Sequence, residues 1–277
     1  MMRALRAVRA ILHILQETGR AARVCADLPS FVRLSTDLVR YRTWPARNRP
    51  FDNSERRVRF RGGVTITYRL NKGDIWSVRE VWLYDVYRLP FDISPRVIVD
   101  LGGNIGLTSV WLSKRYGCER VLVVEPAAAN AALARRNLAD NAIPAELIEA
   151  AVGAEDGVGH FHDDDRSNQG SLGDSGREIP VLSMASVLGH LPAEIMVDLV
   201  KVDIEGGEQE LLMAPDLSWL RRVRALIFEF HPTLVDYPRL IAQVEKAGFR
   251  YYRANTVIPE NMDSFLRIQE EPSPVST

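Results

Sequence analysis

The segment 97–126 constrains the fold more than any other part of the chain. A short apolar run, Val97–Val99, is followed by a glycine-containing turn and an apolar helical pattern. A second apolar run, Val121–Val124, then ends at an acidic residue. Short apolar runs bounded by turn signals are typical of strands buried on both faces, as in parallel sheets. The order strand, turn, helix, strand therefore predicts a mostly parallel α/β sheet.

The same alternation continues along the chain. The pattern predicts further strands at 146–152, 199–204, 225–230, 250–253 and 265–268, and helices at 108–116, 127–141 and 239–247. Upstream it predicts helices at 3–20, 31–41 and 80–88, and a hairpin formed by 58–60 and 64–70. We therefore expect an N-terminal helical and hairpin extension of residues 1–90 and an α/β domain of residues 91–277. Such sheets bind ligands beyond the carboxyl ends of their strands.

The glycine turn after the first strand predicts a ligand-binding loop. Gly102 and Gly106 allow the backbone to turn sharply and to approach a ligand closely. A dinucleotide loop requires GxGxxG, but Asn104 and Leu107 stand where the second and third glycines would be. The chain also contains no GxxxxGK[ST] phosphate loop. The turn therefore disfavours a cofactor that is held through a pyrophosphate.

Acidic residues lie at the ends of both strands around this turn. Glu125 ends the second strand, where its two oxygens can accept hydrogen bonds from both hydroxyls of a ribose. Asp100 or Glu125 alone could be a cap or a surface charge, but together around a glycine turn they indicate a binding site. At the end of the third strand, Ala151 and Val152 fit a flat ring and fit packing against a neighbouring strand equally well.

Charged residues also interrupt two later strands. Lys201, Asp203 and Glu205 alternate along one of them, although a central parallel strand is normally apolar throughout. Residues two apart on a strand share a side, so Asp203 and Glu205 are expected in the crevice at its carboxyl end. Glu229 and His231 repeat the arrangement on the next strand. We expect Lys201 to reach the crevice or to pair with a carboxylate.

These stretches resemble the FkbM family of methyltransferases. The block KVDIEGGEQELL and the later IFEFHP carry the resemblance, together with DLGGNIG, VVEP and AAVG upstream, and it extends over residues 60–268. The sequence departs from the family pattern at Gly103 and Gly207, where alanine is frequent. The resemblance implies the class I methyltransferase fold, a Rossmann-like seven-stranded sheet with helices on both faces. It also implies S-adenosylmethionine as cofactor and methylation of a hydroxyl on a sugar, a polyketide or a related natural product.

The site residues follow from these motifs. The cofactor-binding set comprises Asp100, Gly102, Asn104, Gly106, Glu125, Pro126, Ala151, Val152 and Asp203. Methyl transfer requires alignment of the acceptor oxygen and removal of its proton. His231 is the first candidate for the base, because an ordinary histidine pKa of about 6.5 suits proton uptake at neutral pH. Glu229 could orient the ring, and Asp203 could receive a hydrogen bond from the cofactor's amino group or from the acceptor.

A metal site is a second hypothesis for the same residues. Asp203, Glu205 and Glu229 could hold a divalent cation such as Mg²⁺, which would lower the pKa of the acceptor. The run 160–165, His-Phe-His-Asp-Asp-Asp, also resembles a metal cluster. It continues into a loop rich in Ser, Asn and Gly, so a solvated loop over the active site is the favoured interpretation.

The N-terminal part of the chain differs in charge from the rest. Residues 1–61 contain 14 Arg, no Lys and five acidic residues, a net charge of +9, whereas the remainder carries a net charge of −10. The predicted first helix is amphipathic, with Leu5, Val8, Leu12 and Leu15 on one face and Arg3, Arg6 and Arg9 on another. A basic arm indicates an anionic partner, a membrane surface contacted through residues 1–23, or packing on the chain's own acidic domain. Packing is the favoured interpretation.

Other features narrow the function classes. The sequence contains no run of about eighteen uncharged apolar residues, and its N-terminal arginines are not arranged as in a secretory leader. Two cysteines are too few for a disulfide framework. We therefore expect a cytoplasmic protein that acts on a small-molecule acceptor, with homo-oligomerisation left open. The alternatives are a non-catalytic cofactor-binding module and an RNA-directed methyltransferase, although the (D/N/S)PP(Y/F) and Pro-Cys motifs of nucleic-acid methylation are missing.

Overall fold

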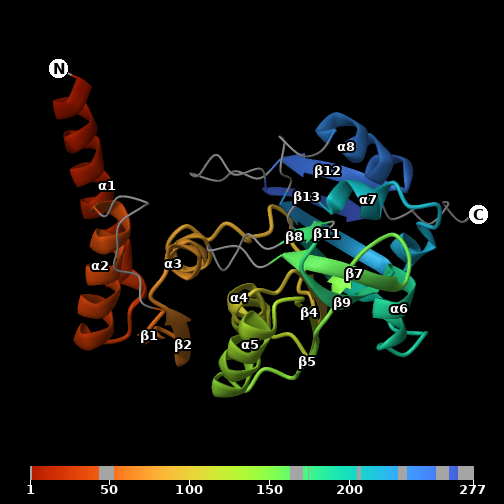
Figure 1. The fold of residues 1–277 in the computed structure, drawn as a ribbon, viewed down its shortest axis with the longest axis horizontal. Coiled ribbons are helices and arrows are strands. Elements are labelled where there is room, and N and C mark those ends of the chain that lie inside the picture. Colours follow the sequence, from red (N-terminus) through yellow and green to blue (C-terminus); the bar gives the residue numbers. More distant parts are fainter. Residues whose placement is uncertain are drawn as a thin grey trace, which may run out of the picture.

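The computed structural model describes residues 2–43, 53–162, 171–173, 175–204, 207–229, 236–253 and 262–267. The described residues form a large central sheet, a small second sheet beside it, and an N-terminal unit of helices and a hairpin that stands at one end of the molecule (Figure 1).

The central sheet has seven strands in the order β12-β13-β11-β10-β3-β4-β5. They are β3 (Val97–Leu101), β4 (Arg120–Val124), β5 (Ala145–Ile148), β10 (Val197–Val202), β11 (Val223–Glu229), β12 (Phe249–Arg253) and β13 (Met262–Arg267). Neighbouring strands are parallel except that β13 runs antiparallel to both β11 and β12. The predicted seven-stranded, mostly parallel α/β fold is confirmed.

Helices cover both faces of this sheet. They are α4 (Leu107–Tyr116), α5 (Ala128–Asp140), α6 (Met184–Gly189), α7 (Glu208–Leu212), α8 (Tyr237–Lys246) and the 3₁₀ helix η2 (Ser218–Arg222). Successive strand residues enter opposite cores: Ile98 packs with the side chains of α4 and α5, and Val99 packs with those of α6, α7 and α8. The central strands are therefore mostly apolar because both of their faces are buried, and Asp100 and Lys201 are buried exceptions.

The second sheet was not predicted. Its strands are β6 (Ala151–Val152), β7 (Gly157–His162), β8 (Ser171–Gly173) and β9 (Arg177–Leu182), in the order β6-β9-β7-β8. The predicted strand 146–152 is wrong as a single element, because the chain leaves the central sheet after Ile148 and residues 151–152 pair with β9. On β7 the two histidines are exposed, and the acidic residues 163–165 lie outside the described residues.

The N-terminal unit contains two long helices, a hairpin and a short helical segment. Its elements are α1 (Met2–Val24), α2 (Leu28–Thr43), β1 (Glu55–Phe60), β2 (Val64–Arg69), α3 (Lys72–Val78) and the π-helix η1 (Arg79–Leu83). The two long helices and the hairpin are confirmed. The predicted helix 80–88 is misplaced: α3 begins after Asn71, whose side chain accepts a hydrogen bond from the Asp74 amide, and the helical segment ends at Leu83.

The first helix packs on the rest of the chain through its second half. Ala21 is fully buried, and so is Glu17, which accepts hydrogen bonds from Arg42 and Arg79. The apolar face predicted for this helix is not buried against the chain: Leu12 is 59% exposed and Leu15 is 63% exposed. None of the described helices combines the length and apolarity needed to span a bilayer.

Two asparagines, Asn137 of α5 and Asn141 at its C-cap, join the hairpin to the α/β domain. Asn137 accepts a hydrogen bond from the Thr67 amide at 2.8 Å and donates to the Thr67 carbonyl at 2.9 Å. Asn141 makes the same pair of bonds with Thr65, at 2.9 and 2.7 Å. One helical turn between the asparagines rises by about 6 Å, close to the spacing of alternate residues on a strand. The two amides therefore satisfy the free edge of β2 as a third strand would.

We expect the Asn137→Ala variant to be less stable by about 2–4 kcal/mol, because the substitution leaves the buried amide and carbonyl of Thr67 without partners. Urea denaturation measures the free energy of unfolding. Arg135→Ala, on the exposed face of the same helix, removes only a half-exposed ion pair with Glu149 and should cost less than about 1 kcal/mol. Equal effects of the two substitutions would contradict the docking role of Asn137.

Candidate active site

Four of the predicted site residues lie in one row at the carboxyl edge of the central sheet. Leu101 is aligned with Val124 on one side and with Val202 on the other, and Val202 is aligned with Phe228. The residues that follow these positions are Gly102, Glu125, Asp203 and Glu229. The strand register therefore brings together the glycine turn, the acidic end of β4 and the ends of β10 and β11.

The glycine turn is held tightly between its neighbours. Gly102 has a φ of 73°, and a Cβ at this position would lie 1.8 Å from the carbonyl oxygen of Asp203. A Cβ at Gly103 would lie 2.2 Å from a methyl carbon of Val123. Glycine at position 103, where the family frequently has alanine, therefore leaves room for the side chain of Val123. Asn104 has a φ of 47°, an uncommon conformation outside glycine.

Glu125 holds the turn from the neighbouring strand. Its carboxylate accepts hydrogen bonds from the amide of Asn104 at 2.7 Å and from the amide of Ala127 at 2.9 Å. The side chain is only 4% exposed. Burial raises the pKa of Glu125 to about 7, although these hydrogen bonds and the charge of Lys201 oppose the shift. Glu125 therefore changes its charge near neutral pH.

Lys201 forms a buried ionic cluster beneath the row. Its ammonium lies 3.2 Å from Asp100 Oδ1 and 3.3 Å from Asp203 Oδ2, and it donates a hydrogen bond to the carbonyl of Gly102 at 2.7 Å. Burial acts to lower the pKa of Lys201, but the charges of Asp100, Asp203 and Glu229 outweigh it and raise the pKa above its ordinary value. The lysine therefore keeps its positive charge. It pairs with carboxylates, which is one of the two roles that the sequence predicts for it.

Asp100 lies within β3, two residues before Gly102. It is fully buried, and its second oxygen accepts a hydrogen bond from the hydroxyl of Ser109 at 2.5 Å. Its carboxylate thus joins α4 to Lys201. Gly106, also in the predicted set, has a φ of 80° and precedes the first residue of α4.

Residues of the N-terminal unit also lie against the candidate site, and the sequence pattern did not predict this contact. Tyr87 is 4% exposed, and the ammonium of Lys201 lies 5.9 Å from its ring centroid. Burial and the charges of the carboxylates Asp203 and Glu229 raise the pKa of Tyr87 well above its ordinary value. On α3, the hydroxyl of Ser77 accepts a hydrogen bond from the Asn104 side chain at 3.2 Å. The only signal was the aromatic-rich run WLYDVY at 82–87.

The remaining predicted residues are placed as follows. Ala151 and Val152 are buried, and Ala151 packs in a small apolar cluster that includes Ala127 and Phe161. The carbonyl of Pro126 accepts a hydrogen bond from Arg177 at 2.9 Å. Glu205 and His231 lie outside the described residues.

The metal hypothesis finds no support in this arrangement. The part of the chain that the structure describes contains no group of three or more His, Cys, Asp or Glu side chains placed to hold a metal ion. The position near Asp100 and Asp203 is taken by the ammonium of Lys201, which supplies the positive charge between those carboxylates.

The polar groups around the glycine turn fit a nucleoside-containing cofactor. Asn104 Oδ1 is buried without a hydrogen-bond partner and is thus available as an acceptor in the turn. Glu125 and Asp203 add carboxylates on the two sides of the turn. Gly102 between them has no side chain, so its backbone is not covered by one. These groups match the donors of a ribose and of an amino group.

Comparisons with known proteins find methyltransferases. Residues 100–251 match the model of the methyltransferase FkbM domain. "Methyltransferase 1" of Beauveria bassiana (strain ARSEF 2860) is 26% identical over 191 residues, which cover 60% of this chain and 76% of that protein. "Methyltransferase sdnD" of Sordaria araneosa is 25% identical over 202 residues, covering 60% and 77% of the two chains.

Solved methyltransferase structures are more distant. Precorrin-6y C5,15-methyltransferase from Geobacter metallireducens GS-15 has a TM-score of 0.42 and 16% identity, covering 69% of this chain and 88% of its own. An O-methyltransferase from Bacillus cereus in complex with SAH has a TM-score of 0.38 and 12% identity, covering 64% and 75%.

We expect the Lys201→Met variant to be less stable by about 3–5 kcal/mol, because it leaves the buried carboxylate of Asp100 and the partly buried carboxylate of Asp203 without their cation. The free energy of unfolding in urea measures the effect. Lys114→Met, on the exposed surface of α4, is the matched control and should change stability by less than about 1 kcal/mol. A Lys201→Met protein as stable as the control would contradict the role assigned to the cluster.

Proposed function

The chain belongs to the FkbM family of S-adenosylmethionine-dependent methyltransferases, and we propose that it methylates a hydroxyl oxygen of a small molecule of the sugar, glycoside or polyketide type. The observation that carries the proposal is the row of Gly102, Glu125, Asp203 and Glu229 at one edge of the sheet. In this proposal, cofactor-binding groups of the row lie beside groups that orient the acceptor.

On one side of the row, the residues suit the cofactor. Glu125 would accept hydrogen bonds from the ribose hydroxyls, and Asp203 would accept one from the amino group. The bare backbone at Gly102 and the free acceptor of Asn104 line the turn between them. Asp100 acts as a positioning residue through Lys201 and Ser109. S-adenosylmethionine, when bound, supplies an electrophilic methyl group on a sulfonium.

On the other side, we place the acceptor. Its hydroxyl must be aligned with the methyl group and must lose a proton. His231, two residues beyond Glu229 in the sequence, is the proposed base, and Glu229 is proposed to orient it. The ammonium of Lys201 lies 3.3 Å from Asp203 Oδ2 and would hold this carboxylate in position to accept a hydrogen bond.

The N-terminal unit is proposed to cover the acceptor side. The contacts of Tyr87 with the Lys201 cluster and of Ser77 with Asn104 support an arm of residues 1–90 that closes the crevice. The RNA-directed alternative is not favoured, because several arm arginines are paired with the chain's own carboxylates, as Arg42 and Arg79 are with Glu17. The non-catalytic alternative predicts cofactor binding without turnover.

We expect the affinity for S-adenosylmethionine to fall about tenfold between pH 8 and pH 6 because of Glu125, whose pKa is raised to about 7. Ionised Glu125 offers two acceptor oxygens to the ribose, and protonation removes one of them. Titration calorimetry of wild type and Glu125→Gln separates this effect from titration of the cofactor itself. The variant should bind at least about tenfold more weakly at pH 8, and its pH dependence should lack the Glu125 contribution. The same pH profile in both proteins would contradict the assignment.

We expect His231→Ala to lower turnover by about 10²–10⁴-fold without changing cofactor affinity, because it removes the base and not the binding groups. An acceptor is first identified by screening sugars, glycosides and polyketide-type alcohols for release of S-adenosylhomocysteine. His190→Ala, an exposed histidine that pairs with Glu146, is the control. Unchanged turnover in the variant would reject His231 as the base, and cofactor binding without any turnover across the screen would favour a non-catalytic module.

A further inference from the structure

The exposed apolar side chains of this protein are concentrated on two helices. The described residues include seven large hydrophobic side chains that are exposed, and all but Val158 lie on α1 and α2: Ile11, Leu12, Leu15, Leu28, Val32 and Val39. Single exposed hydrophobic residues are common, but their concentration on one unit marks an interaction surface. These six residues are called the α1–α2 surface below. They lie on the unit that stands apart from the two sheets (Figure 1).

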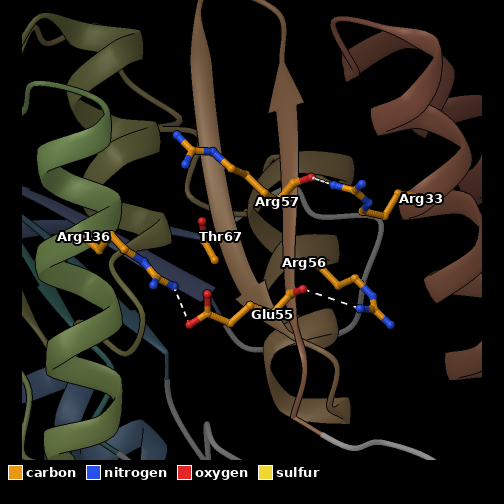
Figure 2. Close-up of a pocket in the computed structure, with 6 residues that line it drawn as sticks. All are labelled: Arg33, Glu55, Arg56, Arg57, Thr67 and Arg136. Carbon is orange, nitrogen blue, oxygen red and sulfur yellow. Dashed lines mark hydrogen bonds and ion pairs between the residues drawn. The ribbon is translucent and has the colours of Figure 1, made fainter.

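The apolar residues of α2 lie beside arginines. Leu28 and Val32 are one helical turn apart, and they line a groove of about 490 Å³ together with Arg33, Arg40 and Arg56. A second pocket of about 370 Å³ adjoins it, with Arg33 and Arg56 in common. Figure 2 shows this second pocket, in which Arg33 reaches from α2 to the main-chain oxygen of Arg57 on β1. The surface therefore combines apolar side chains with guanidinium groups.

The arginines here are only partly balanced by acidic groups. The carboxylate of Asp37 is 3.3 Å from Arg40 and 3.6 Å from Arg56, and its side chain is 1% exposed. Burial raises the pKa of Asp37 even though Arg56, Arg40 and Arg33 oppose the shift. Three cations thus surround one carboxylate. In the second pocket Arg136 is paired with Glu55 at 2.7 Å, while Arg33 is bonded to a carbonyl and not to an acid.

We propose that the α1–α2 surface docks on a lipid bilayer that contains anionic phospholipids. Helices with exposed apolar residues beside arginines lie in the interface of a membrane, with the apolar side chains at the boundary of headgroups and acyl chains. Arg33 and its neighbours contact the phosphates, which guanidinium groups bind well. Residues 1–61 carry a net charge of +9, which is complementary to such a membrane.

The charge also argues against a second copy of the chain as the occupant. A symmetric contact would place this surface against itself, and the two positive surfaces would repel each other. The six side chains are aliphatic, so the aromatic platforms that stack nucleic-acid bases are missing from the α1–α2 surface. An anionic bilayer satisfies both the charge and the apolar character.

The test is flotation of the full chain with vesicles of phosphatidylcholine alone and of phosphatidylcholine mixed with phosphatidylglycerol. We expect binding to the anionic vesicles, weakened by salt. The double substitution Leu28→Ser and Val32→Ser should lower binding by at least about tenfold, and Arg33→Gln should lower it about fivefold. The controls are Val158→Ser on β7, which is 73% exposed, and Arg250→Gln on the exposed side of β12.

The controls should bind vesicles as wild type does, and every variant should bind S-adenosylmethionine with unchanged affinity, which separates this surface from the active site. Failure of the wild type to bind anionic vesicles would overturn the proposal, as would equal loss in the Val158→Ser control. A wild-type dimer in light scattering that the double substitution dissociates, without vesicle binding, would instead assign the surface to a second copy.

Discussion

The candidate site depends on the interactions of the buried ammonium of Lys201. It lies on β10, between a carboxylate of β3 and the carboxylate that ends its own strand, and it also bonds to the carbonyl of Gly102 in the turn. Burying any one of these charges alone would be costly, but the set is mutually compensated. Because the cation contacts both the turn and Asp203, it holds these two parts of the candidate site at a fixed separation.

A second set of polar contacts joins the N-terminal hairpin to this centre. Asn137 and Asn141 pair with the edge of β2, and Arg69 of the same strand bonds to both Asp74 and Asn130. Asn130 in turn donates to Glu125, at 3.4 Å. The hairpin is thus connected to the carboxylate that holds the glycine turn. Loss of the hairpin would therefore disturb the candidate site, although the hairpin residues are distant in sequence from the site residues.

The parts of the fold that the sequence predicts are those with a local signal. Buried parallel strands are short apolar runs, and the acidic residues at their ends mark the carboxyl edge of the sheet, so the position of Glu125, Asp203 and Glu229 at one edge could be predicted. The second sheet could not, because β7 is a mostly exposed strand with glycines and histidines in place of an apolar run. Tyr87 was missed for another reason. Its role depends on a fold that brings residue 87 against residue 201, and no local pattern encodes such a contact.

The amphipathic pattern of α1 shows how a correct periodicity can lead to a wrong packing partner. Leu12 and Leu15 do share a face, yet the helix packs through Glu17 and Ala21 on another side. Glu17 can be buried because Arg79 of η1 and Arg42 of α2 form ion pairs with it, each at 2.6 Å, and these cations compensate its charge. From η1 the chain leads back through α3, where Ser77 accepts a hydrogen bond from Asn104 in the glycine turn. The same segment therefore contacts the helix that presents the exposed leucines and the glycine turn that is proposed to bind the cofactor. An ionic contact in place of an apolar one leaves the leucines of α1 available for a partner outside the chain.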